Sequence, residues 1–169
     1  MKSNNSNSEK DRPRGLKIYR TISEDENHIS RVAEVDANGY YSYSDYYRWF
    51  SSDKLELIRG KVFAKSPAPS LTHQRWCGFL YVKLCDFLSA TQYEVFINPF
   101  DVRIPDRSSS DVEIFTVVQP DICVVFDQAK LDEKGCVGTP DVVIEVLSAG
   151  NNWRELIDKY KVYEEAGVL

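Results

Sequence analysis

The pattern of hydrophobic and polar residues divides the chain into two parts. The first residues are almost all polar, and the later residues show the periodic hydrophobic positions of strands and helices. Residues 1–15 are mostly Asn, Ser and charged residues with little to bury, and we expect them to be disordered. After them, "LKIYRTI" is typical of a short strand, and the polar stretch that follows it is typical of a connection with one helical turn. We therefore expect residues 1–38 to be a disordered or weakly structured extension and residues 39–169 to form the folded domain.

Within residues 39–169, three segments have the spacing of helices. A serine precedes Asp45 and aromatic residues follow at helical spacing, which predicts a short capped helix that includes Trp49 and Phe50. Ser70–Ala90 carries an apolar stripe of helical period, and the segment from Asn151 to Gly167 begins with a capping residue and ends with glycine. The stripe of the second segment contains Trp76, Phe79, Leu80, Leu84, Phe87 and Leu88.

Short runs of β-formers separate these helices. "LELIRGKVFAK" predicts a hairpin that turns at Arg59-Gly60. Further strands are expected at "YEVFI", "FDVRI", "VVQPDICVVF" and "DVVIEVLS". This order of elements predicts a mixed α/β domain in which a central sheet is flanked by helices.

Composition limits the class of protein. A length of 169 residues is enough for one domain with a core, and a net charge of -5 argues against a basic nucleic-acid coat without excluding a nuclease with a local basic rim. No apolar run reaches transmembrane length and no signal peptide is recognisable, so we expect a cytoplasmic protein with no membrane association. The four cysteines have no CxxC spacing and no cluster with histidine, so reduced thiols are expected rather than a zinc site.

Acidic residues lie in or beside the two most apolar strands, where an unpaired charge would cost several kcal/mol. Asp141 and Glu145 point to the same face of their strand but lie about 13 Å apart, which is too far for one metal ion. Asp121 lies within the other strand, and directly opposed residues of neighbouring strands have Cβ atoms about 5 Å apart. If the two strands pair, Asp121 and Glu145 would be close enough to share a divalent ion, and Asp141 would only start its strand.

A cation is available on the helix that follows. Leu156, Tyr160 and Tyr163 form its apolar stripe, and Lys159 lies one position from that stripe. The Lys159 ammonium would therefore either reach the acids of the sheet or extend along the edge of the core into water.

These acids, in this order, resemble the PD-(D/E)xK nuclease signature, in which Asp and Glu hold Mg²⁺ and a lysine assists. The chain as a whole is similar to the Uma family of restriction endonucleases. The matching pieces span residues 40–168 and are "YSYSDYYRW", "LELIRGK", "SPAPSLTHQ", "VVQPDICVV", "TPDVVIEVLS" and "RELIDKYKVYEEAGV".

The resemblance implies a restriction-endonuclease-like fold, possession of a Mg²⁺ or Mn²⁺ ion, and DNA as the substrate. It implies that Asp121, Glu145 and Glu56 bind the metal. Because Leu147 occupies the usual lysine position, Lys159 would take over the role of that lysine. His73 matches a family histidine and would be either catalytic or a hydrogen-bonding residue at a helix start.

The resemblance also implies a homodimer, and the family pattern continues with strands beyond residue 169, so the domain is expected to lack its C-terminal strands. Two alternatives to a DNA endonuclease remain open. One is a catalytically inactive module of the same fold that binds DNA or a protein partner. The other is a hydrolase that acts on RNA or a nucleotide.

Overall fold

The computed structural model describes residues 19–24, 29–36, 38–50, 54–64, 69–147 and 153–168. Its strands form one six-stranded sheet and two three-stranded sheets, and helices complete a mixed α/β fold. The helices are α1 (Tyr43–Tyr46), α2 (Leu71–Leu88) and α3 (Trp153–Glu165), with a 3-10 turn η1 (Gln128–Lys130). The strands are β1 (Tyr19–Glu24), β2 (Ile29–Glu34), β3 (Trp49–Phe50), β4 (Leu55–Ile58), β5 (Lys61–Ala64), β6 (Glu94–Ile97), β7 (Val102–Ile104), β8 (Thr116–Val118), β9 (Ile122–Val125), β10 (Leu131–Asp132), β11 (Gly135–Val137) and β12 (Val142–Ile144).

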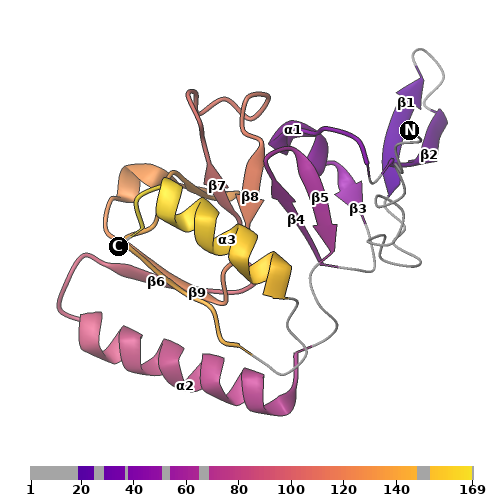
Figure 1. Ribbon diagram of the computed structural model, residues 1–169. Coiled ribbons are helices and arrows are strands. Elements are labelled where there is room, and N and C mark those ends of the chain that lie inside the picture. Colours follow the sequence, from indigo (N-terminus) through magenta and orange to yellow (C-terminus); the bar gives the residue numbers. More distant parts are fainter. Residues whose placement is uncertain are drawn as a thin grey trace, which may run out of the picture.

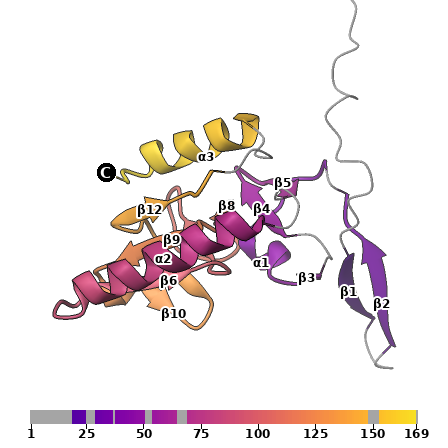
Figure 2. The ribbon, with the colours of Figure 1, turned by 90° about the horizontal axis from the view of Figure 1, so that it is seen from below.

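The two larger helices lie on opposite sides of the sheet β12-β9-β6. In Figure 1, α2 runs along the outer side of β6 and β9, and α3 lies on the other side, between these strands and the six-stranded sheet. In Figure 2, which views the molecule from below, α2 runs across β6 and β9. The six-stranded sheet has the order β10-β11-β7-β8-β4-β5 and is mixed, because β11 pairs with β7 in parallel and its other pairs are antiparallel.

The main core lies between the six-stranded sheet, the sheet β12-β9-β6 and helix α3. Val162 and Tyr163 of α3 pack there together with Cys123 and Val125 of β9 and with Ile58 of β4. A Gly167 with φ of 79° ends the helix: the Gly167 and Val168 N–H groups donate to the carbonyls of Glu164 and Tyr163. This is the hydrogen-bond pattern of a Schellman motif, which satisfies carbonyls in the last turn of α3.

The predicted hairpin around Arg59-Gly60 is confirmed. Both turn residues have positive φ, 49° for Arg59 and 74° for Gly60, as a two-residue type I′ turn requires. Strands β4 and β5 pair from Leu55↔Ala64 to Ile58↔Lys61. The alternation along β4 directs Glu56 and Ile58 towards α3 and directs Leu55 and Leu57 into the smaller clusters around Tyr43 and Val35.

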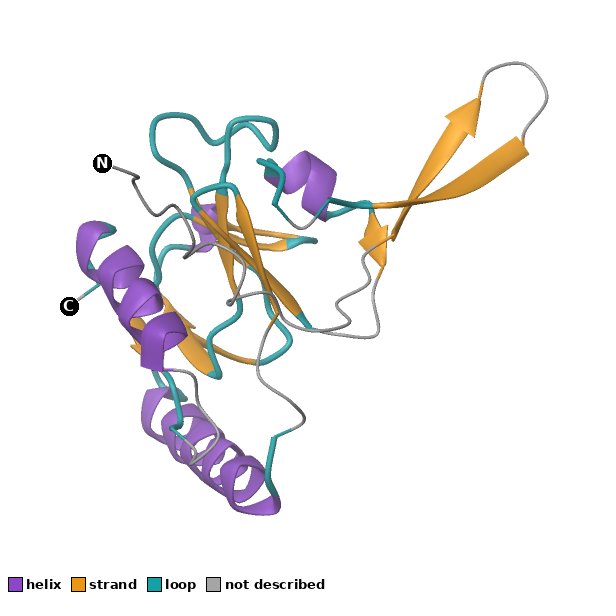
Figure 3. Cartoon of the chain, turned by 45° about the vertical axis from the view of Figure 1, so that its right-hand side comes forward, coloured by secondary structure: helices purple, strands orange, loops and turns teal. Residues whose placement is uncertain are grey.

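Two predictions for residues 19–50 are wrong. Trp49 and Phe50 belong to β3 rather than to the first helix, which ends at Tyr46, because β3 pairs with β1. The stretch expected to be a polar connection contains β2, which forms an antiparallel hairpin with β1. Figure 3 shows this hairpin projecting away from the rest of the chain, and its strands are held by pairing with each other and with β3.

The segment "VVQPDICVVF" forms two strands and not one. Strand β8 ends at Val118 in the six-stranded sheet, and β9 begins at Ile122 in the three-stranded sheet. Pro120 lies between them and has no N–H with which to continue a ladder. Asp121 is therefore at the point where the chain passes from one sheet to the other.

The expected apolar stripe of α2 is only partly buried. Trp76 and Phe79 are 54% and 52% exposed and Phe87 is 82% exposed, while Cys77 is the buried residue of the helix. Helix α2 covers a sheet of only three strands, so its contact area is small and most of its apolar face stays outside the described core. Among the described helices, none is both long and apolar enough to cross a membrane.

Replacing Gly135 by alanine should destabilise the fold by about 2 kcal/mol or more, because its φ of 125° is strained for a residue with a Cβ. That Cβ would also lie 2.2 Å from the Asp101 carbonyl oxygen, which accepts the Cys136 N–H. The matched control is Gly78→Ala in α2, where a Cβ meets nothing within 4 Å and should stabilise the helix by up to about 1 kcal/mol. Urea unfolding of both variants measures the difference, and equal free energies of unfolding would contradict the prediction.

Candidate active site

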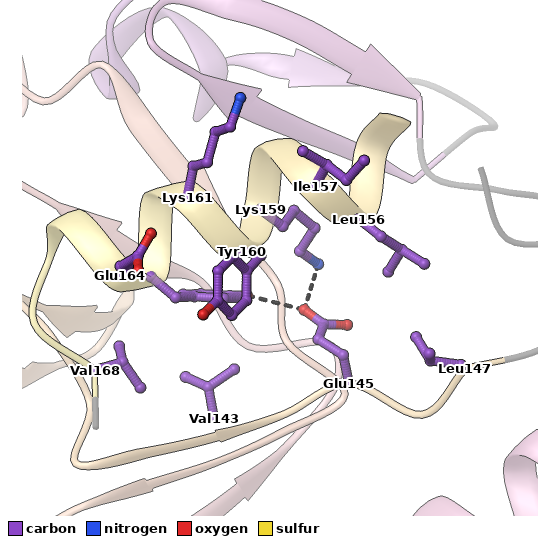
Figure 4. Close-up of a pocket in the computed structure, with 11 residues that line it drawn as sticks. Val143, Glu145, Leu147, Leu156, Ile157, Lys159, Tyr160, Lys161, Glu164 and Val168 are labelled. Atoms are coloured by element: carbon purple, nitrogen blue, oxygen red, sulfur yellow. Dashed lines mark hydrogen bonds and ion pairs between the residues drawn. The ribbon is translucent and has the colours of Figure 1, made fainter. Parts of the chain in front are cut away.

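A network of buried ionic side chains lies between β4, β12 and α3. The Lys159 Nζ lies 2.9 Å from Glu56 Oε1 and 2.5 Å from Glu145 Oε1, so one ammonium bridges two carboxylates. Glu56 has no exposed surface and Lys159 is 2% exposed. Figure 4 shows Lys159 reaching from α3 down to Glu145 at the end of β12.

Lys159 is at the centre of the inward face of α3, not beside it. Lys159, Val162 and Tyr163 are all buried and lie at i, i+3 and i+4, whereas Tyr160 is 66% exposed. The prediction that Tyr160 belongs to the buried stripe is therefore wrong, because the neighbouring residue Lys159 takes that place. The physical reason is the pair of carboxylates beneath the helix, which makes burial of the lysine head favourable where burial of an unpaired ammonium would not be.

Two opposing effects act on the protonation of Lys159. Burial lowers the pKa of this ammonium, but the neighbouring Glu56 and Glu145 carboxylates raise it more, so the pKa of Lys159 lies above its ordinary value. Lys159 is therefore a permanent cation at neutral pH. It can hold acids and stabilise negative charge, but it cannot act as a general base.

The sequence pattern predicted Tyr163 as a core residue and gave no sign that it contacts the acids. Its hydroxyl donates to Glu145 Oε1 at 2.9 Å, and the same oxygen accepts from Lys159. Burial first, and then the charges of Glu145 and Glu56, raise the pKa of Tyr163 well above its ordinary value, so it stays a donor. One oxygen of Glu145 is thus fixed by two donors.

Asp121 lies beside this group at the start of β9. Strands β9 and β12 are antiparallel neighbours, with Ile122 paired to Ile144, so continuation of the register places Asp121 opposite Glu145. The Val146 N–H donates to Asp121 Oδ2 at 2.8 Å. The strand pairing on which the Asp121/Glu145 hypothesis depends is therefore present, and Asp141, which is exposed, accepts instead from the Phe126 N–H.

The turn that carries Asp121 is fixed on several sides. The Gln119 N–H donates to Glu56 Oε1, and the Gln119 amide donates to Asp101 Oδ1. Asn98 donates through its side chain to the Gln119 carbonyl and through its backbone N–H to the Asp121 carbonyl. These bonds explain why "QPD" adopts one conformation, and they connect Asp121 to Glu56 through the backbone of Gln119.

On its other side, Asp121 contacts α2. His73 Nε2 lies 3.1 Å from Asp121 Oδ2, and the Cys77 thiol lies 3.5 Å from His73 Nδ1. The expectation that no cysteine lies near a histidine is therefore wrong. The missed signal was the i, i+4 spacing of His73 and Cys77, which places both side chains on one face of a helix. Within the described part of the chain, these three residues are the one set of three or more metal-ligating side chains whose ligand atoms all lie within 4.8 Å of one another.

A groove opens beside Glu145, between α3 and the end of β12. It has a volume of about 780 Å³. Most of its lining is apolar, and Glu145 and Lys159 supply polar atoms at its base (Figure 4). Asp121 does not line it, so the groove gives access to one carboxylate of the group and not to the whole set.

The basic residues that could contact phosphates from the sequence are Arg59, Lys61, Lys65, Arg75 and Arg154, and they do not form a described patch. Arg59 pairs with Glu165 at 2.6 Å, and the Lys61 ammonium donates to the carbonyls of Asn38 and Gly39. Arg75 is exposed on α2. Lys65 and the side chain of Arg154 lie outside the described residues.

Comparisons with known proteins agree with this architecture. A nuclease structure from Anabaena variabilis, described as "a putative nuclease belonging to DUF820", superposes with a TM-score of 0.57 at 17% sequence identity, over 73% of this chain and 68% of that one. No curated protein matches the sequence. The family model Uma2, described as "Putative restriction endonuclease", matches residues 43–169, which contain every acid, lysine and histidine discussed above. The chain therefore belongs to the Uma2 family of restriction-endonuclease-like proteins.

Proposed function

We propose that this protein is a divalent-metal-dependent endonuclease that hydrolyses phosphodiester bonds of DNA. The observation that carries the proposal is the buried lysine held between two glutamates, next to an aspartate on the neighbouring strand. Burying ionic groups costs desolvation free energy that an apolar core would not cost, and such groups are concentrated at functional sites. Membership of a restriction endonuclease family supports a nucleic acid as the substrate.

The donor set suits a hard divalent cation in ligand type and in charge, and binding would have to draw the three carboxylates closer together, because their ligand atoms do not all lie within 4.8 Å of one another. The three carboxylates of Glu56, Asp121 and Glu145 carry three negative charges when ionised, and Lys159 carries one positive charge. The group therefore has two negative charges in excess, which one divalent ion balances. Carboxylate oxygens are the ligands that Mg²⁺ and Mn²⁺ prefer. Asp121 and Glu145 would hold the ion because they lie opposite each other on paired strands. Glu56 would be a further ligand, or would act through Lys159. The cation would supply positive charge at the scissile phosphate and make a nearby water molecule more acidic.

The protein's own groups would position the reactants. Lys159, a permanent cation, would orient the attacking water or stabilise the charge that develops on the phosphate. Tyr163 would keep Glu145 in one rotamer through its hydroxyl. His73 would orient Asp121, because its Nε2 is within hydrogen-bond distance of Asp121 Oδ2.

The test is cleavage of supercoiled plasmid DNA with Mg²⁺ or Mn²⁺ added. We expect nicking or linearisation that stops when EDTA removes the ion and resumes when excess Mn²⁺ is restored. Glu145→Gln keeps the size of the side chain and the acceptor for Tyr163 but removes one charge from the ion site, so its rate should fall by about 100-fold or more.

The matched control is Glu164→Gln, an exposed glutamate on α3 that also lines the groove. Its cleavage rate should equal that of the parent. DNA binding without cleavage in either metal, together with no heat of Mn²⁺ binding in calorimetry, would refute the proposal and favour a non-catalytic binding module. Cleavage of an RNA of the same sequence at the DNA rate would refute the assignment of the substrate.

A further inference from the structure

We propose that His73, Cys77 and Asp121 form a second metal site, which takes Zn²⁺ or a similar borderline-soft ion and is distinct in its chemistry from the carboxylate site. The three side chains supply one nitrogen, one sulfur and one oxygen ligand, all within 4.8 Å of one another. Neither Cys77 nor a soft metal has a part in the proposed hydrolysis. Occupancy of the site does not depend on the proposed function.

Two of the three distances between the ligand atoms are close to those of a tetrahedral zinc centre. With Zn–N and Zn–O bonds of about 2.1 Å and a Zn–S bond of about 2.3 Å, tetrahedral angles place nitrogen about 3.4 Å from oxygen and about 3.6 Å from sulfur. His73 Nε2 lies 3.1 Å from Asp121 Oδ2 and 4.0 Å from Cys77 Sγ. Shifts of about 0.4 Å or less in these two pairs would reach the ideal values, and the side chains can make such shifts by small rotations.

Two of the ligands come from one rigid element. His73 and Cys77 lie four residues apart on α2, and zinc sites use helical ligand pairs at this spacing. The Ser70 hydroxyl accepts the His73 N–H and so fixes the first turn of the helix. Cys77 is 5% exposed and the side chains of His73 and Asp121 are 13% and 10% exposed, so the site is shielded from bulk water on most sides.

Zinc binding at these side chains has a defined proton balance. Cys77 can donate its S–H to His73 Nδ1, and His73 can donate its Nε2–H to Asp121. When Zn²⁺ binds Nε2, the ring proton moves to Nδ1 and the thiol loses its proton to solvent. Binding to neutral His73 therefore releases one proton and leaves a thiolate, an imidazole and a carboxylate around the ion.

The thiolate distinguishes this site from the carboxylate site. Sulfur ligands select Zn²⁺ over Mg²⁺ and Mn²⁺, whereas the carboxylates prefer the harder ions. Asp121 belongs to both sets, so an ion on His73 and Cys77 would draw Asp121 towards α2 and away from Glu145. We therefore expect Zn²⁺ to weaken Mn²⁺ binding, and this second effect alone rests on the proposed function.

The experiment titrates the full chain with Zn²⁺ and with Co²⁺ as a spectroscopic substitute. In the parent, Co²⁺ should produce the d–d bands of a tetrahedral centre together with a thiolate-to-cobalt charge-transfer band, and Zn²⁺ should remove both. Cys77→Ser should lose the charge-transfer band and at least about 100-fold in Zn²⁺ affinity, since loss of an outer-shell partner alone costs 10–100-fold. Cys85→Ser, on the same helix and outside the cluster, is the matched control and should bind as the parent does.

Two results would overturn the inference. One is an unchanged Zn²⁺ affinity in Cys77→Ser. The other is a charge-transfer band that survives in Cys77→Ser and disappears in Cys85→Ser. Far-ultraviolet circular dichroism of both variants excludes misfolding, and His73→Ala provides a second variant if Cys77→Ser does not fold. These readouts are independent of DNA cleavage, so an inactive but zinc-binding protein would refute the proposed function and leave this site intact.

Discussion

Lys159→Met should lower the free energy of unfolding by about 3–5 kcal/mol, the typical cost of removing one partner from a buried ion pair. The methionine fits the space of the lysine stem but leaves Glu56, which has no exposed surface, without its ammonium. Because a domain has only about 5–15 kcal/mol of stability, this loss would be easily measured by guanidinium unfolding. DNA cleavage should disappear as well.

A second substitution separates stability from activity. In Lys159→Met/Glu56→Gln the buried negative charge is gone, while the glutamine can still accept the Gln119 N–H. We expect at least half of the lost stability to return and cleavage to remain absent. Lys161→Met is the matched control, because Lys161 is exposed on the same helix and points away from Glu145 in Figure 4, and its effect should be within about 0.5 kcal/mol. A Lys159→Met protein as stable as the parent would show that the ion pairs contribute nothing.

The pH dependence of this effect has a definite sign. The pKa of Lys159 is raised in the folded state, so its stabilising contribution is complete below the unfolded pKa of about 10.4 and is lost as the pH rises through the higher folded pKa. The stability difference between parent and Lys159→Met should therefore be constant from pH 6 to about pH 9 and should shrink only in strong alkali. A difference that declines near pH 7 would mean that Lys159 is neutral at physiological pH.

Asp121→Asn should reduce DNA cleavage by about 100-fold or more and weaken Mn²⁺ binding, while the fold is retained. Asparagine has the same shape and keeps an oxygen that can accept the Val146 N–H, but it removes one of the two charges proposed to face the ion. The several kcal/mol of charge stabilisation that a catalytic metal supplies depend on these carboxylates. Plasmid cleavage and calorimetric Mn²⁺ titration measure the two effects.

The other Pro-Asp pair of the chain offers the matched control. Asp141→Asn changes the same residue type after a proline, at an exposed position whose carboxylate only accepts the Phe126 N–H. Its cleavage rate and Mn²⁺ affinity should stay within about twofold of the parent. If Asp121→Asn cuts DNA as fast as Asp141→Asn, Asp121 is not part of the active site.

Local patterns were sufficient for several features of the chain. The hairpin at Arg59-Gly60 follows from a turn glycine between two runs of β-formers, and α2 follows from the helical period of its apolar residues. The distance along one strand was enough to separate Asp141 from Glu145. The predictions of the hairpin and of α2 held because each depends on contacts between residues close in sequence.

Other features depend on partners far along the chain. The break of "VVQPDICVVF" into β8 and β9 arises because its two halves pair with different sheets, and no local property except Pro120 marks it. The burial of Lys159 depends on Glu56, 103 residues away, and moves the inward face of α3 by one position. Trp76 and Phe79 look like core residues by period, yet the sheet beneath α2 is too narrow to cover them.

The amino-acid order was thus sufficient to predict the class of fold and to single out Asp121, Glu145 and Lys159 as candidates, because residue type and spacing set the chemistry that each segment can offer. Folding was needed to bring Cys77, His73 and Asp121 together and to place one ammonium between two carboxylates. Such groupings depend on sheet pairing and helix orientation. Both are set by the free energy of packing the whole domain, and no single segment encodes them.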